Sequence, residues 1–256
     1  MNSVNTLRAK FKYNSFLLYL FLVLFTSIVH SQDDNQLWTN FALYAPLDKK
    51  FSIGGDVGVR GLTSNRNWNQ ILIRPTAKYR IKKIFKVSAG LALFSTLNQD
   101  ANNVNEFRLN QDFDVAWPKF KWGKLFFRAR LEERWFFYKE LPNNFSFRGR
   151  VLGGIQTKNL TFLGEKRPIY FKLMLEGFIP FERDVTEVFV NNFRWYSAFG
   201  HRISQDFRYE LHYIRQISKL FDSSGMTTPQ NIFRLRLFYT IDPKQDQIDD
   251  EVENPD

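Results

Sequence analysis

The sequence predicts an all-β protein, an antiparallel up-and-down transmembrane β-barrel of ten or twelve strands. Apolar and polar residues alternate with a period of two from Leu37 to Ile241, as in strands with one apolar and one polar face. Most of these segments contain ten to fifteen residues, whereas a membrane-crossing strand needs about nine to eleven and a globular strand averages about five or six. Aromatic residues lie mostly near segment ends, where membrane barrels carry interfacial girdles. They are Trp38, Tyr44, Tyr79, Trp117, Trp122, Trp135, Tyr138, Trp195, Tyr213 and Tyr239.

Residues 1–31 have the pattern of a cleaved secretory signal peptide. The first twelve residues include three basic side chains and no acid, and an apolar run of about fourteen residues then ends at Val29. That run is shorter than the roughly twenty residues of a spanning helix, so cleavage after Ser31 is favoured over an N-terminal membrane anchor. We therefore expect the chain to be exported.

Eleven alternating segments follow this leader. They comprise residues 37–47, 51–62, 67–81, 86–96, 106–117, 124–138, 145–157, 168–179, 189–200, 206–217 and 231–241. The sequences between them, such as 98–103 and 222–225, are rich in Asn, Asp, Ser and Gly, which favour tight turns. Bacterial single-chain barrels have an even number of strands, so we expect one segment to be missed or split and the true number to be ten or twelve.

The end of the chain differs in composition from the alternating segments. Residues 242–256 contain seven acids and one Lys, with too few apolar residues to form a core. We predict an acidic disordered tail there. The domain organisation is then a signal peptide over residues 1–31, an outer-membrane β-barrel over residues 32–241 and this tail.

Each segment places apolar residues on one face and charged residues on the other. Ile71 and Ile73, for example, oppose Arg74. A β-sandwich would bury the apolar face and expose the charges, but the segment lengths and terminal aromatic residues favour a barrel with its apolar face toward lipid. Glu133 and Arg215 fall on the lipid-facing side, so we expect each of them near an interface or beside a β-bulge.

The predicted lumen carries a ladder of charged residues. Neighbouring strands of a meander could join these residues through cross-strand ion pairs and bidentate Arg–carboxylate bonds. The candidate binding residues are Arg108, Asp112, Arg128, Arg130, Glu132, Arg134, Arg148 and Arg150. Two interpretations remain open: a binding site or constriction for an anionic solute, and a structural network that fills a narrow barrel. The whole inferred lumen face has eight more basic than acidic residues, so a channel would prefer anions.

Composition excludes several functional classes. The chain has no cysteine, which removes disulfide scaffolds, thiol nucleophiles and lipid attachment at an N-terminal Cys. Neither a Gly-rich phosphate loop nor a GxSxG nucleophile elbow is present. His212 and Glu210 form the only candidate catalytic pair, because residues two apart on a strand share a face, but no recognisable Ser accompanies them. We expect no catalytic residues, no metal and no cofactor.

Short motifs along residues 36–241 point to a known family. They are Trp38-Thr39-Asn40, Gly58-Val59-Arg60, Gln70-Ile71-Leu72-Ile73-Arg74-Pro75, Glu106-Phe107-Arg108-Leu109-Asn110-Gln111, Arg128-Ala129-Arg130-Leu131-Glu132-Glu133-Arg134 and Phe193-Arg194. Through these motifs the chain resembles the domain of unknown function 2490 family, uncharacterised exported proteins common in Bacteroidetes and related bacteria. The resemblance implies an outer-membrane β-barrel, and the activity of that family is itself unknown.

These observations predict a porin-like protein of the cell outer membrane that is not an enzyme. Its partners would be outer-membrane lipid and small anionic solutes, which a basic lumen could bind or pass, and a structural role in the envelope is equally open. The net charge of +10 does not indicate a nucleic-acid partner, because the basic residues alternate with apolar ones along extended segments. The alternatives are a membrane-surface hydrolase acting on lipid or peptide and a soluble periplasmic β-rich binding protein.

Overall fold

The computed structural model of the protein describes residues 34–63, 68–98, 103–161, 163–164, 167–181, 190–219 and 227–241. The predicted signal peptide over residues 1–31 and the predicted tail over residues 242–256 lie outside these described residues. The strands are β1 Asp34–Pro46, β2 Phe51–Leu62, β3 Trp68–Lys82, β4 Phe85–Asn98, β5 Val104–Ala116, β6 Gly123–Tyr138, β7 Asn144–Thr157, β8 Ile169–Pro180, β9 Val190–Arg202, β10 Phe207–Lys219 and β11 Thr227–Thr240. No helix in the described part of the chain is long and apolar enough to cross a membrane.

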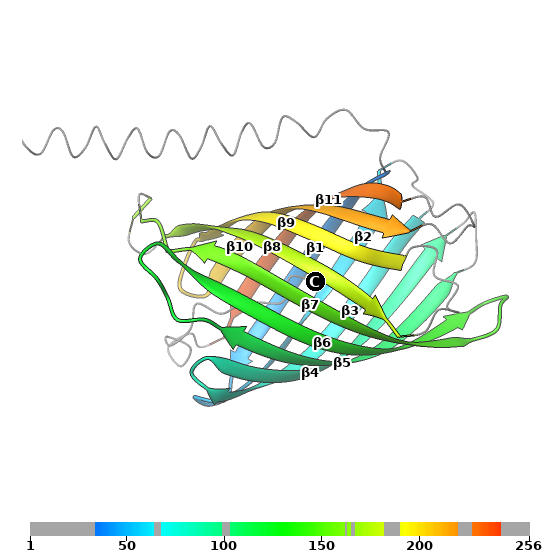
Figure 1. The fold of residues 1–256 in the computed structure, drawn as a ribbon, viewed down its shortest axis with the longest axis horizontal. Coiled ribbons are helices and arrows are strands. Elements are labelled where there is room, and N and C mark those ends of the chain that lie inside the picture. The colour runs from blue at the N-terminus through cyan, green and yellow to red at the C-terminus, as the bar shows by residue number, and fades with distance from the viewer. Residues whose placement is uncertain are drawn as a thin grey trace, which may run out of the picture. The chain divides into compact units, whose positions relative to one another are not determined.

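The strands close into a single β-barrel, in which they run at an incline past one another (Figure 1). Each strand pairs antiparallel with the next in the sequence, and β1 pairs in parallel with β11. The predicted all-β up-and-down barrel is confirmed, but the expected number of ten or twelve strands is wrong, because the described residues form eleven. With an odd number of strands the first and last run in the same direction, so the barrel must close through a parallel pair. We name this β1–β11 pair the seam.

The outer surface of the barrel is apolar and its interior is charged. In β3, Ile71 and Ile73 point outward and are 50% and 51% exposed. Arg74, the next residue along the strand, points inward and is 7% exposed. Outward residues of the other strands, such as Leu93 and Leu175, are likewise more than half exposed. The two faces follow the alternation in the sequence, and they are arranged in the opposite sense to a water-soluble sheet, which buries its apolar face.

Both charged residues expected on the outer face have polar partners there. Gln111 Nε2 donates a hydrogen bond to Glu133 Oε1 at 3.4 Å. Arg215 Nη1 donates to Asn231 Oδ1 at 2.6 Å, and the hydroxyl of Tyr213 donates to the same oxygen at 2.7 Å. The neighbouring strands thus supply a partner for each of these charges.

Trp38 departs from the pattern predicted for the aromatic residues. The sequence predicts it for an outer girdle, but the structure places it inside the barrel, 3% exposed. Its indole Nε1 donates a hydrogen bond to Gln36 Oε1 at 2.8 Å, and the guanidinium carbon of Arg60 lies 3.9 Å from the ring centroid. Trp38 shares the inward face with Gln36 because the two residues are two apart on β1. The strand register overrides the tendency of Trp to lie at an interface.

Candidate functional site

All eight residues predicted for the charge ladder lie inside the barrel, on β5, β6 and β7. Each has an even residue number, and the even-numbered residues of these strands face the interior. Seven of the eight are buried, and the side chain of Arg108 is 14% exposed. The predicted residues therefore do come together on one inner surface.

Glu132 is the hub of this surface. Its Oε2 accepts hydrogen bonds from Arg148 Nη2 at 2.6 Å and from Arg148 Nε at 2.9 Å, and its Oε1 accepts one from Arg150 Nη1 at 2.9 Å. The guanidinium groups of Arg130 and Arg108 lie 3.7 and 4.0 Å from the same Oε1. One carboxylate thus lies within ion-pair distance of four arginines, although Glu132 itself is only 1% exposed.

Two more carboxylates pair directly across β5 and β6. Asp112 accepts two hydrogen bonds from Arg130, at 2.5 Å from Nε and 2.8 Å from Nη2. Asp114 accepts one from Arg128 Nε at 2.6 Å. Each pair joins residues that are direct partners in the strand register. A bidentate Arg–carboxylate pair fixes both the distance and the plane of its two groups, so these bonds hold β5 and β6 in one register.

Glu106 and Glu176 extend the ladder beyond the predicted binding residues. Glu106 Oε1 accepts from Arg108 Nε and Arg134 Nε, both at 2.6 Å. Glu176 on β8 accepts from Arg150 Nε at 2.9 Å and also from the hydroxyl of Tyr196. We name the ion pairs of Glu106, Asp112, Asp114, Glu132 and Glu176 the Glu132 network. Arg150 joins Glu132 to Glu176, so the network reaches from β5 to β8.

A second network surrounds Glu210 on β10. Its Oε1 accepts hydrogen bonds from the Tyr170 hydroxyl and from Lys172 Nζ, both at 2.6 Å. Its Oε2 lies 2.8 Å from His212 Nε2, and Arg234 Nη2 lies 3.1 Å from His212 Nδ1. A guanidinium can only donate, so Nδ1 is the acceptor and Nε2 carries the proton that is donated to Glu210. We name these residues the Glu210 network.

This geometry bears on the candidate catalytic pair of the sequence. Both ring nitrogens of His212 are already engaged, one with Glu210 and one with Arg234. A general base needs a free nitrogen within reach of the proton that it removes. His212 would therefore have to break one of these bonds before acting as a base. Among the described residues, no group of three or more His, Asp or Glu side chains could hold a metal ion.

An apolar layer lies between the two networks. Along β8 the inward residues are Lys172 of the Glu210 network, then Met174, then Glu176 of the Glu132 network. Met174 belongs to a cluster of buried apolar residues inside the barrel. Its members are Trp38, Phe126, Leu152, Met174, Tyr196, Ala198, Ile214 and Ile232. Apolar packing therefore separates the Glu210 network from the Glu132 network along β8.

The described interior has a strong positive bias. Its buried charged residues are six acids and twelve basic residues. The acids are Glu106, Asp112, Asp114, Glu132, Glu176 and Glu210. The basic residues are Arg74, Lys86, Lys124, Arg128, Arg130, Arg134, Arg148, Arg150, Lys172, Arg194, Arg234 and Arg236. Removing so many cations from water is costly unless anionic charge balances them, so an added anion would be stabilised in this interior.

Some members of the two networks could not be identified from the sequence. Tyr170 and Tyr196 hydrogen-bond buried carboxylates, but aromatic residues also occur on the apolar face, so residue type alone does not place them. Lys86 and Lys124 are also buried, but they are not among the eight residues predicted for the charge ladder. The alternation with a period of two could have identified both lysines. Lys86 lies on the inward face at the start of β4, and Lys124 lies on the inward face at the start of β6.

Gly200 gives a test of how tightly the Glu210 network is packed. A Cβ at Gly200 would lie 2.2 Å from Cζ of Tyr170, whose hydroxyl is bound to Glu210. We expect Gly200→Ala to lower the free energy of unfolding by about 1–3 kcal/mol, because the ring must move and break this bond. Gly177→Ala is the matched control, since a Cβ there meets nothing within 4 Å. Denaturant unfolding monitored by Tyr and Trp fluorescence measures both variants, and equal stabilities would contradict the prediction.

One comparison with known proteins gives a match. A family model described as a protein of unknown function (DUF2490) matches residues 35–227. That range begins in β1 and ends at the first residue of β11, so it covers most of the barrel. No curated protein matches the chain.

Proposed function

The chain belongs to the DUF2490 family of proteins of unknown function, and from that premise we propose that it is a non-enzymatic outer-membrane β-barrel whose basic lumen binds and passes small anions. The observation that carries the proposal is the inverted barrel. Apolar side chains cover its outside, while twelve buried basic residues and six buried acids are described inside. Neither a water-soluble sandwich nor a neutral packed core accounts for both features.

The outer surface supports a membrane location. A row of exposed Leu, Ile, Val and Phe side chains is unfavourable in water, and lipid removes that penalty. An Arg or Lys at the bilayer midplane costs about 2–4 kcal/mol on a lipid-facing strand position. The outward Arg215 instead donates a hydrogen bond to Asn231 Oδ1, near the end of β10. The strands, of 12 to 16 residues, are also long enough to cross a bilayer at an incline.

The lumen supports anions as the solute. Rings of Arg and Lys favour anions in pores, and the planar guanidinium groups suit carboxylate and phosphate oxygens. The described acids of the Glu132 network are all bonded to basic residues, so they do not present free negative charge to a passing solute. A passing anion would compete with these carboxylates for hydrogen bonds from the arginines of the ladder.

The location is tested by fractionation of cells that produce the full-length chain. The proposal requires the protein in the outer-membrane fraction, with a gel mobility that changes on heating, as folded membrane barrels show. Release of the folded protein together with the periplasmic contents would refute the membrane location and would favour a soluble binding protein.

Passage of anions is tested by conductance in planar bilayers. We expect discrete current steps, with a reversal potential under a salt gradient that indicates anion selectivity. Arg130→Glu should weaken that selectivity, because it replaces a lumen cation by an anion beside Asp112. Lys139→Glu in the turn after β6 makes the same charge change outside the lumen and is the control. Cation selectivity, or a correctly folded protein without conductance, would refute passage.

A further inference from the structure

The turn between β1 and β2 forms one wall of a pocket at an end of the barrel. Asp48 Oδ1 accepts hydrogen bonds from the backbone N–H of Lys50 at 2.6 Å and of Phe51 at 2.7 Å. This is the Asx arrangement, which fixes the shape of a tight turn. The same two bonds hold the pKa of the Asp48 carboxyl below its ordinary value. Asp48 is therefore ionised at neutral pH and is committed to the turn.

The end of β3 holds this turn in place. Arg80 Nη1 donates a hydrogen bond to the carbonyl oxygen of Lys49 at 2.9 Å, and the backbone N–H of Arg80 donates to the carbonyl oxygen of Lys50 at 2.7 Å. On the same strand, Lys78 Nζ donates to the Tyr44 hydroxyl at 2.9 Å. The backbone of the turn and the stems of Lys78 and Arg80 are thus fixed relative to one another.

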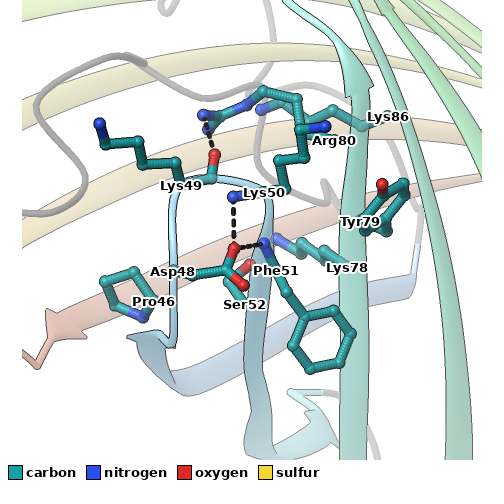
Figure 2. A pocket seen from close by; sticks show the side chains of 10 residues that line it. All are labelled: Pro46, Asp48, Lys49, Lys50, Phe51, Ser52, Lys78, Tyr79, Arg80 and Lys86. Atoms are coloured by element: carbon teal, nitrogen blue, oxygen red, sulfur yellow. Dashed lines mark hydrogen bonds between the residues drawn. The ribbon is translucent and has the colours of Figure 1, made fainter.

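Basic side chains dominate the lining of the pocket. Figure 2 shows Arg80 and Lys86 beside the turn that carries Lys49, while the ring of Tyr79 points away from them. The ten lining residues are Pro46, Asp48, Lys49, Lys50, Phe51, Ser52, Lys78, Tyr79, Arg80 and Lys86. Five are basic and one is acidic. The basic groups come from three separate elements, the turn, β3 and β4, so the folded barrel brings them together.

We propose that this pocket, which we name the β1–β2 turn pocket, binds a phosphate group, either as free phosphate or in a lipid headgroup. A phosphate dianion has several acceptor oxygens and can bind more than one cation, and Lys and Arg are the residues that bind it in proteins. Lys49 and Lys50 are exposed and can turn toward a ligand, whereas Lys86 is buried. The proposal needs neither a membrane nor an open lumen, so it can fail or hold independently of the proposed function.

The experiment measures binding of inorganic phosphate to the full-length protein. The protein is purified in a detergent solution that contains physiological salt and no phosphate. Isothermal titration should show saturable binding, weakened about tenfold or more in Lys49→Gln/Lys50→Gln, because two of the five cations are removed. Both residues are exposed, so the barrel should still fold, and circular dichroism checks this. The control is Lys121→Gln/Lys158→Gln, which removes two exposed charges from turns at the same end of the barrel. Binding in the control should change less than twofold.

A second arm distinguishes the two sources of the phosphate. The same variants are titrated with vesicles of phosphatidylcholine alone and with vesicles that contain phosphatidic acid. Binding of inorganic phosphate identifies a site for the free anion, and binding of phosphatidic acid vesicles alone identifies a headgroup site. The proposal is overturned if neither probe binds, if the turn variant binds as well as the unmodified protein, or if both double variants lose binding equally.

Discussion

Glu132→Gln is expected to lower the free energy of unfolding by about 3–5 kcal/mol, the range found when one partner of a buried ion pair is removed. The carboxylate of Glu132 lies between Arg148 and Arg150, with two further arginines within 4.0 Å. A neutral amide keeps the size of the side chain but removes the negative charge. Four buried guanidinium groups would then repel one another without their shared counter-ion.

The neighbouring Glu133 provides the control for this substitution. It is chemically identical and one residue further along β6, but it faces outward, and it accepts one long hydrogen bond, from Gln111 Nε2 at 3.4 Å. Glu133→Gln should therefore change the stability by less than about 1 kcal/mol. Urea unfolding of both variants in the same micelles measures the difference. Equal stabilities of the two variants would show that the Glu132 network does not stabilise the barrel.

A disulfide across the seam is expected to form nearly completely in Phe41→Cys/Leu237→Cys. These two residues are direct partners in the parallel β1–β11 register, and both lie on the outward face. Opposite residues of paired strands lie within the Cα separation that a disulfide spans. The natural chain has no cysteine, so no other disulfide competes. Oxidation should give a cross-linked species whose mobility on a denaturing gel shifts back on reduction.

The register is tested by moving one cysteine along β11. In Phe41→Cys/Phe233→Cys the second cysteine lies four residues from the partner position, about 13 Å along the strand, which is too far for a disulfide. This pair should remain reduced under the same conditions. Cross-linking of both pairs, or of neither, would contradict the parallel closure and would reopen the question of an even strand number.

The ends of the strands could be predicted from the sequence to within four residues. The segment predicted over 51–62 is β2, and the segment predicted over 124–138 differs from β6 by one residue. Alternation in the sequence directly reflects which side chains enter a barrel, so it also located Arg130 and Glu132 inside. The even number of strands expected from the sequence is wrong, because that expectation rests on a regularity of known barrels and not on the residues themselves. Local alternation carries no information on how the first strand meets the last.

Only part of the candidate site could be predicted, and the reason is physical. Asp112 and Arg130 lie on consecutive strands with a short connection, so their pairing follows from the hairpin. The bond between Arg150 and Glu176 depends on the register of β7 against β8, which the longer connection between these strands does not fix in the sequence. The hydrogen bond of Tyr196 to Glu176 could not be predicted from residue type either, since tyrosine suits both faces of a barrel strand.

The seam also has a consequence for the order of folding. Every other pair of strands is a hairpin of neighbours in sequence, whereas Gln36 Nε2 meets Gln230 Oε1, 3.2 Å away, across 194 positions of the chain. Contacts of such high sequence separation form slowly, because the entropy of a long loop is lost before the contact is made. The hairpins can therefore assemble first, and closure is the late step. Until then β1 and β11 are two unpaired edges, open to pairing with another chain. The time between assembly and closure is when this protein is most exposed to aggregation.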